Sequence, residues 1–247
     1  MSGADPLGRA AGNLAGWHDA SVRAVGRRTA VTDGVWHGVG PVPPIYFQAI
    51  TVQPPSPAQV DAVRTAVDGP GRSVVCDTWG GLDLRRAGLA PEGDTPWFER
   101  PPGPPAPAER RSPPAGLEVV PVRDEATLRR FEATSVAAFG GDPGAHRPLA
   151  LHGPGLLDEP GMTAWLAVLG GRPVGSAMSW LGAGVVGVYA VAVLPRARRR
   201  GIGEALTWTA TLADPERPAV LQPSHQAMRL YRRLGYREIG RSRTWST

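Results

Sequence analysis

The sequence predicts a mixed α/β fold in two folded halves, and three observations support this. In residues 117–247, strand-like and helix-like segments follow in the order strand, helix, loop, three strands, helix, strand, helix, strand. Hydrophobic residues make up 42% and charged residues 20% of the 247 positions, as in a globular protein with an ordinary core. Prolines crowd residues 101–114 and exclude packed structure there, because each lacks a backbone donor and fixes its own φ. We therefore divide the chain into units 1–100 and 117–247, joined by a stiff linker at 101–116.

The C-terminal half begins with a short strand, a capped helix and a long loop. The strand is predicted at 117–122, and Asp124 is a typical N-cap for a helix that ends at Phe139. Residues 140–161 are rich in Gly, Pro and His and predict a loop. A Gly-Gly-Arg-Pro turn then joins two strands into a hairpin, at 163–169 and 174–180.

The remaining elements alternate strand and helix. A β-branched strand ends before Pro195, and the apolar residues after it have helical spacing over 201–212. Ser224 is a typical N-cap, and a second apolar stripe at helical spacing follows it. Strands are predicted at 187–193, 219–222 and 236–243, the last of which closes the sheet.

The N-terminal half has a similar mixture of elements. The phrase Asp83-Leu-Arg-Arg-Ala-Gly-Leu89 resembles Leu230-Tyr-Arg-Arg-Leu-Gly-Tyr236, and both follow a short predicted strand. This internal similarity favours two diverged copies of one fold. Helices are predicted at 7–28, 56–67 and 81–88, and strands at 32–38, 46–52 and 72–78. The tryptophans expected to pack the first core or its interface with the second half are Trp17, Trp36, Trp79 and Trp97.

Composition excludes several classes of protein. All 27 basic residues are arginine, which excludes a GxxxxGK[ST] phosphate loop and a lysine Schiff base with pyridoxal phosphate. Cys76 is the only cysteine, so an intrachain disulfide and a thiolate zinc cluster are excluded, and no metal is expected. The first ten residues lack the pattern of a secretory signal, and no apolar stretch is long enough to span a bilayer. We expect a cytoplasmic protein without a membrane partner.

The net positive charge lies in the C-terminal half. Residues 1–115 carry 11 arginines and 11 acidic residues, whereas residues 116–247 carry 16 arginines and 11 acidic residues, a balance of +5. The excess gathers in two short clusters, which suit a compact polyanion such as a nucleotide-like cofactor better than a nucleic-acid duplex. For the second cluster, a solvated helix face is favoured over a binding role. The clusters are Arg196, Arg198, Arg199 and Arg200, and Arg229, Arg232, Arg233 and Arg237.

The most informative motif lies at residues 188–206. A strand ends at a proline, and an Arg-x-x-Gly-x-Gly turn then opens a helix. The first turn of a helix presents unpaired N–H groups and a partial positive charge, which bind phosphate. Gly201 and Gly203 have no side chain to obstruct a pyrophosphate, and the arginines from Arg198 to Arg200 add positive charge. The order strand, proline, turn and helix is more specific than an isolated Gly-x-Gly.

At these residues the chain resembles the GCN5-related N-acetyltransferase (GNAT) superfamily. Arg198-x-x-Gly201-x-Gly203 matches the superfamily pattern [Q/R]-x-x-G-x-[G/A] after its fourth strand. The second superfamily motif is matched by Leu221-Gln-Pro-Ser224 followed by residues 227–236. The resemblance covers about 117–247, and the whole chain resembles the tandem branch, in which the N-terminal copy has lost its cofactor loop.

The resemblance implies a role for each matched position. The pantetheine arm of acetyl-CoA would enter a V-shaped opening between the fourth and fifth strands. Tyr231 would donate a proton to the departing thiolate, and Ser224 would hydrogen-bond near the sulfur. Strand residues implied to pair with the pantetheine are Val191, Ala192 and Val193. Residues implied to present amides to the pyrophosphate are Arg199, Arg200, Gly201, Ile202, Gly203 and Glu204.

The chain departs from the superfamily at the general base. Many members carry a glutamate on the fourth strand, where this sequence has Tyr189. Ser176 and Ser179 are predicted either to touch the acceptor or to lie on an exposed strand face. Other candidates for the base, each also explained as a solvated residue, are His146, His152, Asp158, Glu159 and Glu132.

The function expected from the sequence is an acyl-CoA-dependent N-acyltransferase, with acetyl-CoA as donor and a small amine as acceptor. The amine would attack the thioester directly, and the strand amide near Val191 would polarise the carbonyl. Alternatives are a carrier-protein thioester or aminoacyl-tRNA as donor, and a module that binds acyl-CoA without turnover. Nucleic-acid binding is a weaker alternative. The sequence predicts neither the acceptor nor the oligomeric state.

Overall fold

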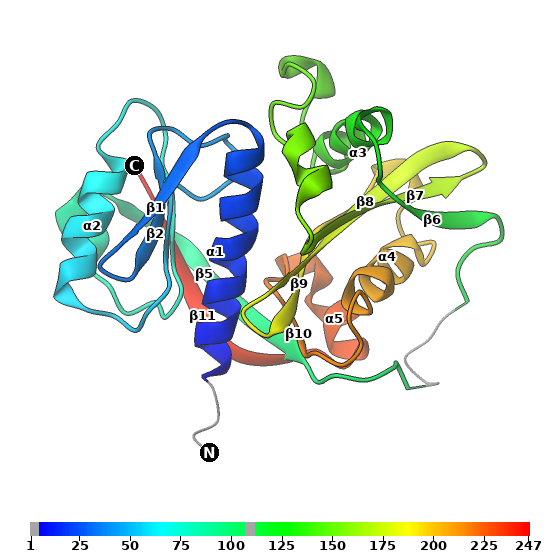
Figure 1. The fold of residues 1–247 in the computed structure, drawn as a ribbon. Coiled ribbons are helices and arrows are strands. Elements are labelled where there is room, and N and C mark those ends of the chain that lie inside the picture. The colour runs from blue at the N-terminus through cyan, green and yellow to red at the C-terminus, as the bar shows by residue number, and fades with distance from the viewer. Residues whose placement is uncertain (1–4, 107–111) are drawn as a thin grey trace.

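A computed structural model describes residues 5–106 and 112–247, so part of the predicted linker, 107–111, lies outside the described residues. One mixed sheet of eleven strands runs through both halves, in the order β1-β2-β3-β4-β11-β5-β10-β9-β8-β7-β6 (Figure 1). The strands are β1 (Arg28–Thr32), β2 (Val35–Val39), β3 (Ala49–Thr51), β4 (Val74–Asp77), β5 (Ala90–Arg100), β6 (Leu117–Pro121), β7 (Met162–Leu169), β8 (Arg172–Gly182), β9 (Val185–Val193), β10 (Ala219–Leu221) and β11 (Arg237–Ser246).

Helices cover both faces of the sheet. The described α-helices are α1 (Pro6–Ala24), α2 (Pro57–Val67), α3 (Glu125–Ala138), α4 (Ile202–Thr211) and α5 (Met228–Arg233). In Figure 1, α1 stands between the two halves, and α4 and α5 lie on the face of β8 and β9 opposite to α3. Separate cores follow from this arrangement, because side chains of α1 and α3 share one cluster, whereas those of α4 and α5 share another.

The strands of the two halves interleave at the centre of the sheet. β11 lies between β4 and β5, and β5 lies between β11 and β10. The prediction that 236–243 closes the sheet is therefore wrong, since β1 and β6 form its edges. β5 was not predicted because it contains Pro91 and Pro96, which lack ladder donors. Its pairing with β10 is confined to Phe98, Glu99 and Arg100, so both prolines lie where only β11 is a neighbour.

Most other predicted elements are confirmed within a few residues, with two local differences. The single strand predicted at 32–38 is a hairpin, because Asp33 and Gly34 both have positive φ and form a two-residue turn between β1 and β2. The helix predicted after Ser224 starts with a 3₁₀ turn at His225–Ala227, and the Ser224 side chain makes no capping hydrogen bond.

The buried side-chain amide of Asn13 on α1 forms hydrogen bonds with the C-terminal half. The Asn13 side chain donates to the carbonyl oxygens of Trp180, Gly182 and Val185, and its oxygen accepts from the Tyr189 hydroxyl at 2.7 Å. The Tyr189 ring stacks on Trp17, with centroids 4.4 Å apart. Tyr189 therefore packs between the two halves and belongs to their shared core.

The tryptophans follow the prediction. Trp17, Trp36 and Trp97 are buried in a cluster with Leu128, Phe131 and Met178 of the C-terminal half, and Trp79 packs partly buried against it. The interface between the halves is thus a hydrophobic core that residues of both halves build.

Candidate active site

A cavity of about 870 Å³ opens beside β9, at the N-terminus of α4. Its walls come from the end of α3, the end of β9, the turn into α4 and the segment before α5. It contains most of the residues that the sequence predicted for the cofactor, as well as Ser224. The predicted residues in its lining are Val191, Ala192, Val193, Arg198, Arg199, Gly201, Ile202, Gly203, Glu204 and Ser224. The structure thus brings these positions to one place.

The turn into α4 is built to expose backbone N–H groups. Arg199 and Gly201 have φ of 61° and 82°, and Gly201 forms the left-handed N-cap without a side-chain hydrogen bond. The first amides of α4 are therefore available to a ligand. A Cβ on Gly203 would lie 3.7 Å from Val193 Cγ2, which is ordinary contact, so protein packing alone does not require glycine here.

The charged side chains of this turn have different tasks. Arg198 donates from Nε to the Val193 carbonyl and from Nη2 to the Ala138 carbonyl, both at 3.0 Å, so it joins β9 to the end of α3. Arg198 is also exposed and lines the cavity, so its contribution of charge to a phosphate stays a prediction. Arg199 and Arg200 are exposed and have no ion-pair partner among the described residues, although of these two only Arg199 lines the cavity. The buried Glu204 carboxylate pairs with Arg233 at 2.5 Å, which offsets its negative charge.

The backbone of β9 changes at the edge of the cavity. β9 pairs with β10 only at Val186 and Gly187, so its last residues have no partner strand on that side. The register with β8 shifts between Ser176 and Met178, and Ala190 has a φ of 50°. This bulge turns backbone groups of β9 out of the regular ladder next to the cavity.

Tyr231 belongs to the core cluster that α4 and α5 share and is not among the residues that line the cavity, whereas Ser224 lies in the cavity wall. Tyr231 is 7% exposed, its hydroxyl hydrogen-bonds with Thr207 of α4, and burial raises its pKa to about 12. The phenol is therefore protonated at neutral pH. Sequence reasoning missed four wall residues that the two motifs do not match: Ala138, Phe139, His225 and Gln226. Arg233 also lines the wall, although the sequence favours a solvated helix face for its cluster.

A second pocket of about 480 Å³ lies on the other side of the bulge, between the two halves. Ala190 lines this pocket, whereas its neighbour Val191 lines the cavity beside α4, and Phe139 lines both. The N-terminal half contributes Trp17 and Ile45. No pattern of the separate halves could have indicated this pocket, because α1 reaches it only through tertiary packing.

The candidates for the base differ in position. His146 and His152 both line the second pocket, and Glu132 is buried behind His152. Glu159 forms an ion pair with Arg23 on α1, so its carboxylate is already engaged within the protein. Ser176 and Ser179 are fully buried, and Ser176 donates to the Ala190 carbonyl, so the exposed strand face predicted for them as an alternative is wrong.

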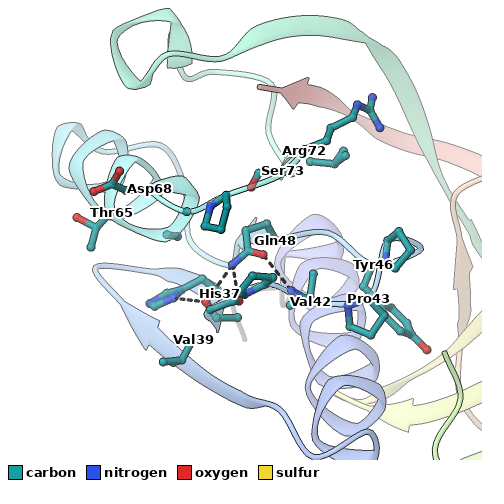
Figure 2. A pocket seen from close by; sticks show the side chains of 18 residues that line it. His37, Val39, Val42, Pro43, Tyr46, Gln48, Thr65, Asp68, Arg72 and Ser73 are labelled. Atoms are coloured by element: carbon teal, nitrogen blue, oxygen red, sulfur yellow. Dashed lines mark hydrogen bonds between the residues drawn. The ribbon is translucent and has the colours of Figure 1, made fainter. Parts of the chain in front are cut away.

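The N-terminal half has a pocket of its own, of about 310 Å³ (Figure 2). Gln48 closes one side by donating to the Gly38 and Gly40 carbonyls and accepting from the Val42 amide. The lining lacks an Arg-x-x-Gly-x-Gly turn, unlike the cavity beside α4.

Comparison with known proteins identifies the class. Residues 160–238 match the family described as "Acetyltransferase (GNAT) domain". No curated protein matches the chain. A GCN5-related N-acetyltransferase from Kribbella flavida is 22% identical, with 95% of each chain covered and a TM-score of 0.63. A GCN5-related N-acetyltransferase-like protein from Streptococcus suis is 11% identical, with 89% of this chain and 87% of that chain covered and a TM-score of 0.56.

Residues 160–238 therefore match a GNAT acetyltransferase domain, which supports an N-acetyltransferase, and the likeness to the Kribbella flavida structure shows the fold. This class uses acetyl-CoA as co-substrate. The likeness to the Kribbella flavida structure extends over both halves of the chain. Within 5–106 and 112–247, no group of three or more His, Cys, Asp or Glu residues could hold a metal, and no helix is long and apolar enough to cross a membrane.

Proposed function

We propose that the cavity beside α4 binds acetyl-CoA and that the pocket on the other side of the β9 bulge binds a small amine. The observation that carries this proposal is the junction at Ala190 and Val191, where neighbouring residues of one strand line the two sites. A thioester bound along Val191, Ala192 and Val193 would present its carbonyl to an amine from the second pocket.

The proposed binding of acetyl-CoA is supported by the turn into α4. The amides of residues 199–204 and the exposed guanidinium groups of Arg199 and Arg200 would hold the pyrophosphate. The open edge of β9 beyond Gly187 supports a V-shaped opening toward β10 for the pantetheine. The pairing of Glu204 with Arg233 lowers the repulsion that a free carboxylate would exert on phosphate.

The transfer itself needs no covalent enzyme intermediate. The amine attacks the thioester carbonyl, the C–N bond forms, and the C–S bond breaks. A backbone amide released by the bulge near Val191 would stabilise the oxyanion. Tyr231 would give its proton to the departing thiolate and recover one from solvent.

The N-terminal half is proposed to be a diverged, catalytically silent copy. Two parallel strand pairs support this, β3 with β4 and β9 with β10, placed on either side of the central β11 and β5. Leu84 stands where the C-terminal half has Tyr231. Its remaining contribution to the reaction would be the wall of the amine pocket, through Trp17 and Ile45.

Replacing Tyr231 with Phe tests the proposed acid. We expect kcat to fall about 100-fold, because the thiolate leaves without a proton donor, while acetyl-CoA binds as in the wild type. Steady-state kinetics and calorimetry measure the two quantities. Thr207→Val is the matched control, since it removes the hydroxyl that faces Tyr231 but leaves the phenol. Equal turnover in wild type and Tyr231→Phe would assign Tyr231 to packing alone.

A further inference from the structure

The amine pocket contains a buried histidine paired with a buried carboxylate. His152 is 2% exposed and lines the pocket, with Nδ1 3.6 Å from Oε2 of Glu132. Nδ1 is buried and has no hydrogen-bond partner among the described residues. Glu132 is thus the acidic group that the inner side of the imidazole faces.

The Glu132 carboxylate is held in place by the loop that carries His152. It accepts backbone hydrogen bonds from Leu149 at 2.6 Å, Leu151 at 3.0 Å and His152 at 2.7 Å. Burial raises the pKa of Glu132, but the interaction with His152 and these backbone donors outweigh it and hold the pKa below its ordinary value. An ionised carboxylate behind Nδ1 favours the tautomer with the proton on Nδ1 and leaves the Nε2 lone pair to accept a proton.

The rest of the pocket is mainly apolar. Trp17 and Ile45 come from the N-terminal half, and Phe139 stands exposed at the rim shared with the cofactor cavity. Within the described lining, no acidic side chain is available to hold a polycationic acceptor. Such a pocket fits one amine on an aromatic or aliphatic body.

We propose that His152, oriented by Glu132, is the base that deprotonates a primary amine whose apolar body lies against Trp17, Ile45 and Phe139. This inference rests on the proposed function and supplies the base missing at Tyr189. An ammonium group loses two protons on becoming an amide, and both pass to solvent, the first of them through His152. The CoA thiolate takes its proton from Tyr231, which recovers one from solvent, so one proton is released per turnover. His152 would be a catalytic residue, and Glu132 a positioning residue.

Two further ionisable groups near His152 stay uncharged at neutral pH. Tyr46 approaches its ring, with centroids 6.4 Å apart, but burial raises the pKa of Tyr46, so it stays neutral. His18 on α1 contacts Tyr46, and burial lowers the pKa of His18 to about 3, so it stays uncharged as well. His146 is exposed in the same loop and lines the same pocket, so His146→Gln shows whether an acid limb comes from His152 or from His146. His37 lines the separate pocket of the N-terminal half and neither proposed site, which makes it the matched control for activity.

The test compares His152→Gln with His37→Gln, using acetyl-CoA with phenethylamine, tryptamine and hexylamine. We expect the wild type to acetylate at least one of these amines, and His152→Gln to lower kcat about 100-fold at neutral pH with unchanged acetyl-CoA affinity. His37→Gln should stay within a few-fold of the wild type. Circular dichroism checks that both variants are folded.

A second measurement separates proton transfer from a structural role. In 2,2-difluorophenethylamine the fluorines make the amine less basic, so more of it arrives unprotonated. The defect of His152→Gln should be several-fold smaller for this amine than for phenethylamine, and for both it should shrink as pH rises. If His152→Gln fails to fold, the kcat/KM profile of the wild type still tests the idea, since its acid limb should persist in His146→Gln.

Each contrary outcome has a separate meaning. Full activity of His152→Gln, an equal defect for both phenethylamines, or loss of the acid limb in His146→Gln overturns His152 as the base. Binding of acetyl-CoA without acetylation of any of the three amines overturns the substrate class. Absence of acetyl-CoA binding overturns the proposed function itself.

Discussion

Gly203→Trp is expected to abolish tight binding of acetyl-CoA, with affinity reduced about 100-fold or more, or roughly 3 kcal/mol. An indole at this position would fill the space in front of the first amides of α4, where the pyrophosphate is proposed to sit. The fold should survive, because a Cβ at Gly203 meets only Val193 and Leu230 at ordinary contact distances. Calorimetric titration of acetyl-CoA, with CoA in parallel, measures the loss.

Two controls make this result specific. Gly203→Ala adds only a methyl group to the same site and should weaken binding much less than the indole. Gly69→Trp places the same indole in the pocket of the N-terminal half, where nothing lies within 4 Å of its Cβ, and should leave binding unchanged. Weakened binding in Gly69→Trp, or a stoichiometry of two per chain, would contradict the assignment of a single site to the C-terminal half.

Asn13→Ala is expected to be the most destabilising single change at the interface between the halves, by roughly 3 kcal/mol. The substitution leaves the buried carbonyls of Trp180, Gly182 and Val185 without their shared donor and the Tyr189 hydroxyl without its acceptor. Urea unfolding followed by circular dichroism measures the free energy of unfolding.

Tyr189→Phe is the matched control for Asn13, since it removes one hydrogen bond of the same network and should cost only about 1 kcal/mol. The double variant should cost less than the sum of the two, because the partners are shared. A loss below 1 kcal/mol in Asn13→Ala would show that α1 is held by apolar packing alone. Because α1 also carries Trp17 into the amine pocket, Asn13→Ala should raise KM for the amine.

The cofactor motif could be predicted from the sequence because it is local. Arg198, Gly201 and Gly203 lie within one strand, turn and helix, and short-range geometry determines how their backbone is presented. Even so, spacing could not show that the Arg198 guanidinium binds the Val193 and Ala138 carbonyls, since Ala138 is distant in sequence. The same limit applies to Tyr231, whose burial depends on the packing of α5 against α4.

The interleaved centre of the sheet could not be predicted, for a different physical reason. Strand pairing between β5 and β11 joins segments more than a hundred residues apart, and the prolines of β5 remove the usual strand pattern. β5 forms a strand because β11 supplies the backbone groups with which it pairs. The sequence of β5 alone does not reveal this partner.

The sequence by itself determined the mixed α/β class and the motifs of the proposed cofactor site. It also showed that position 189 is a tyrosine and supplies no carboxylate. Only the tertiary structure decided that Tyr189 packs against Asn13 and Trp17, that the halves share one sheet, and that His152 lines the proposed amine pocket next to Glu132. The physical reason is the range of the interactions. Helix ends and turns depend on neighbouring residues, whereas a pocket between two halves depends on contacts that form only when distant segments pack together.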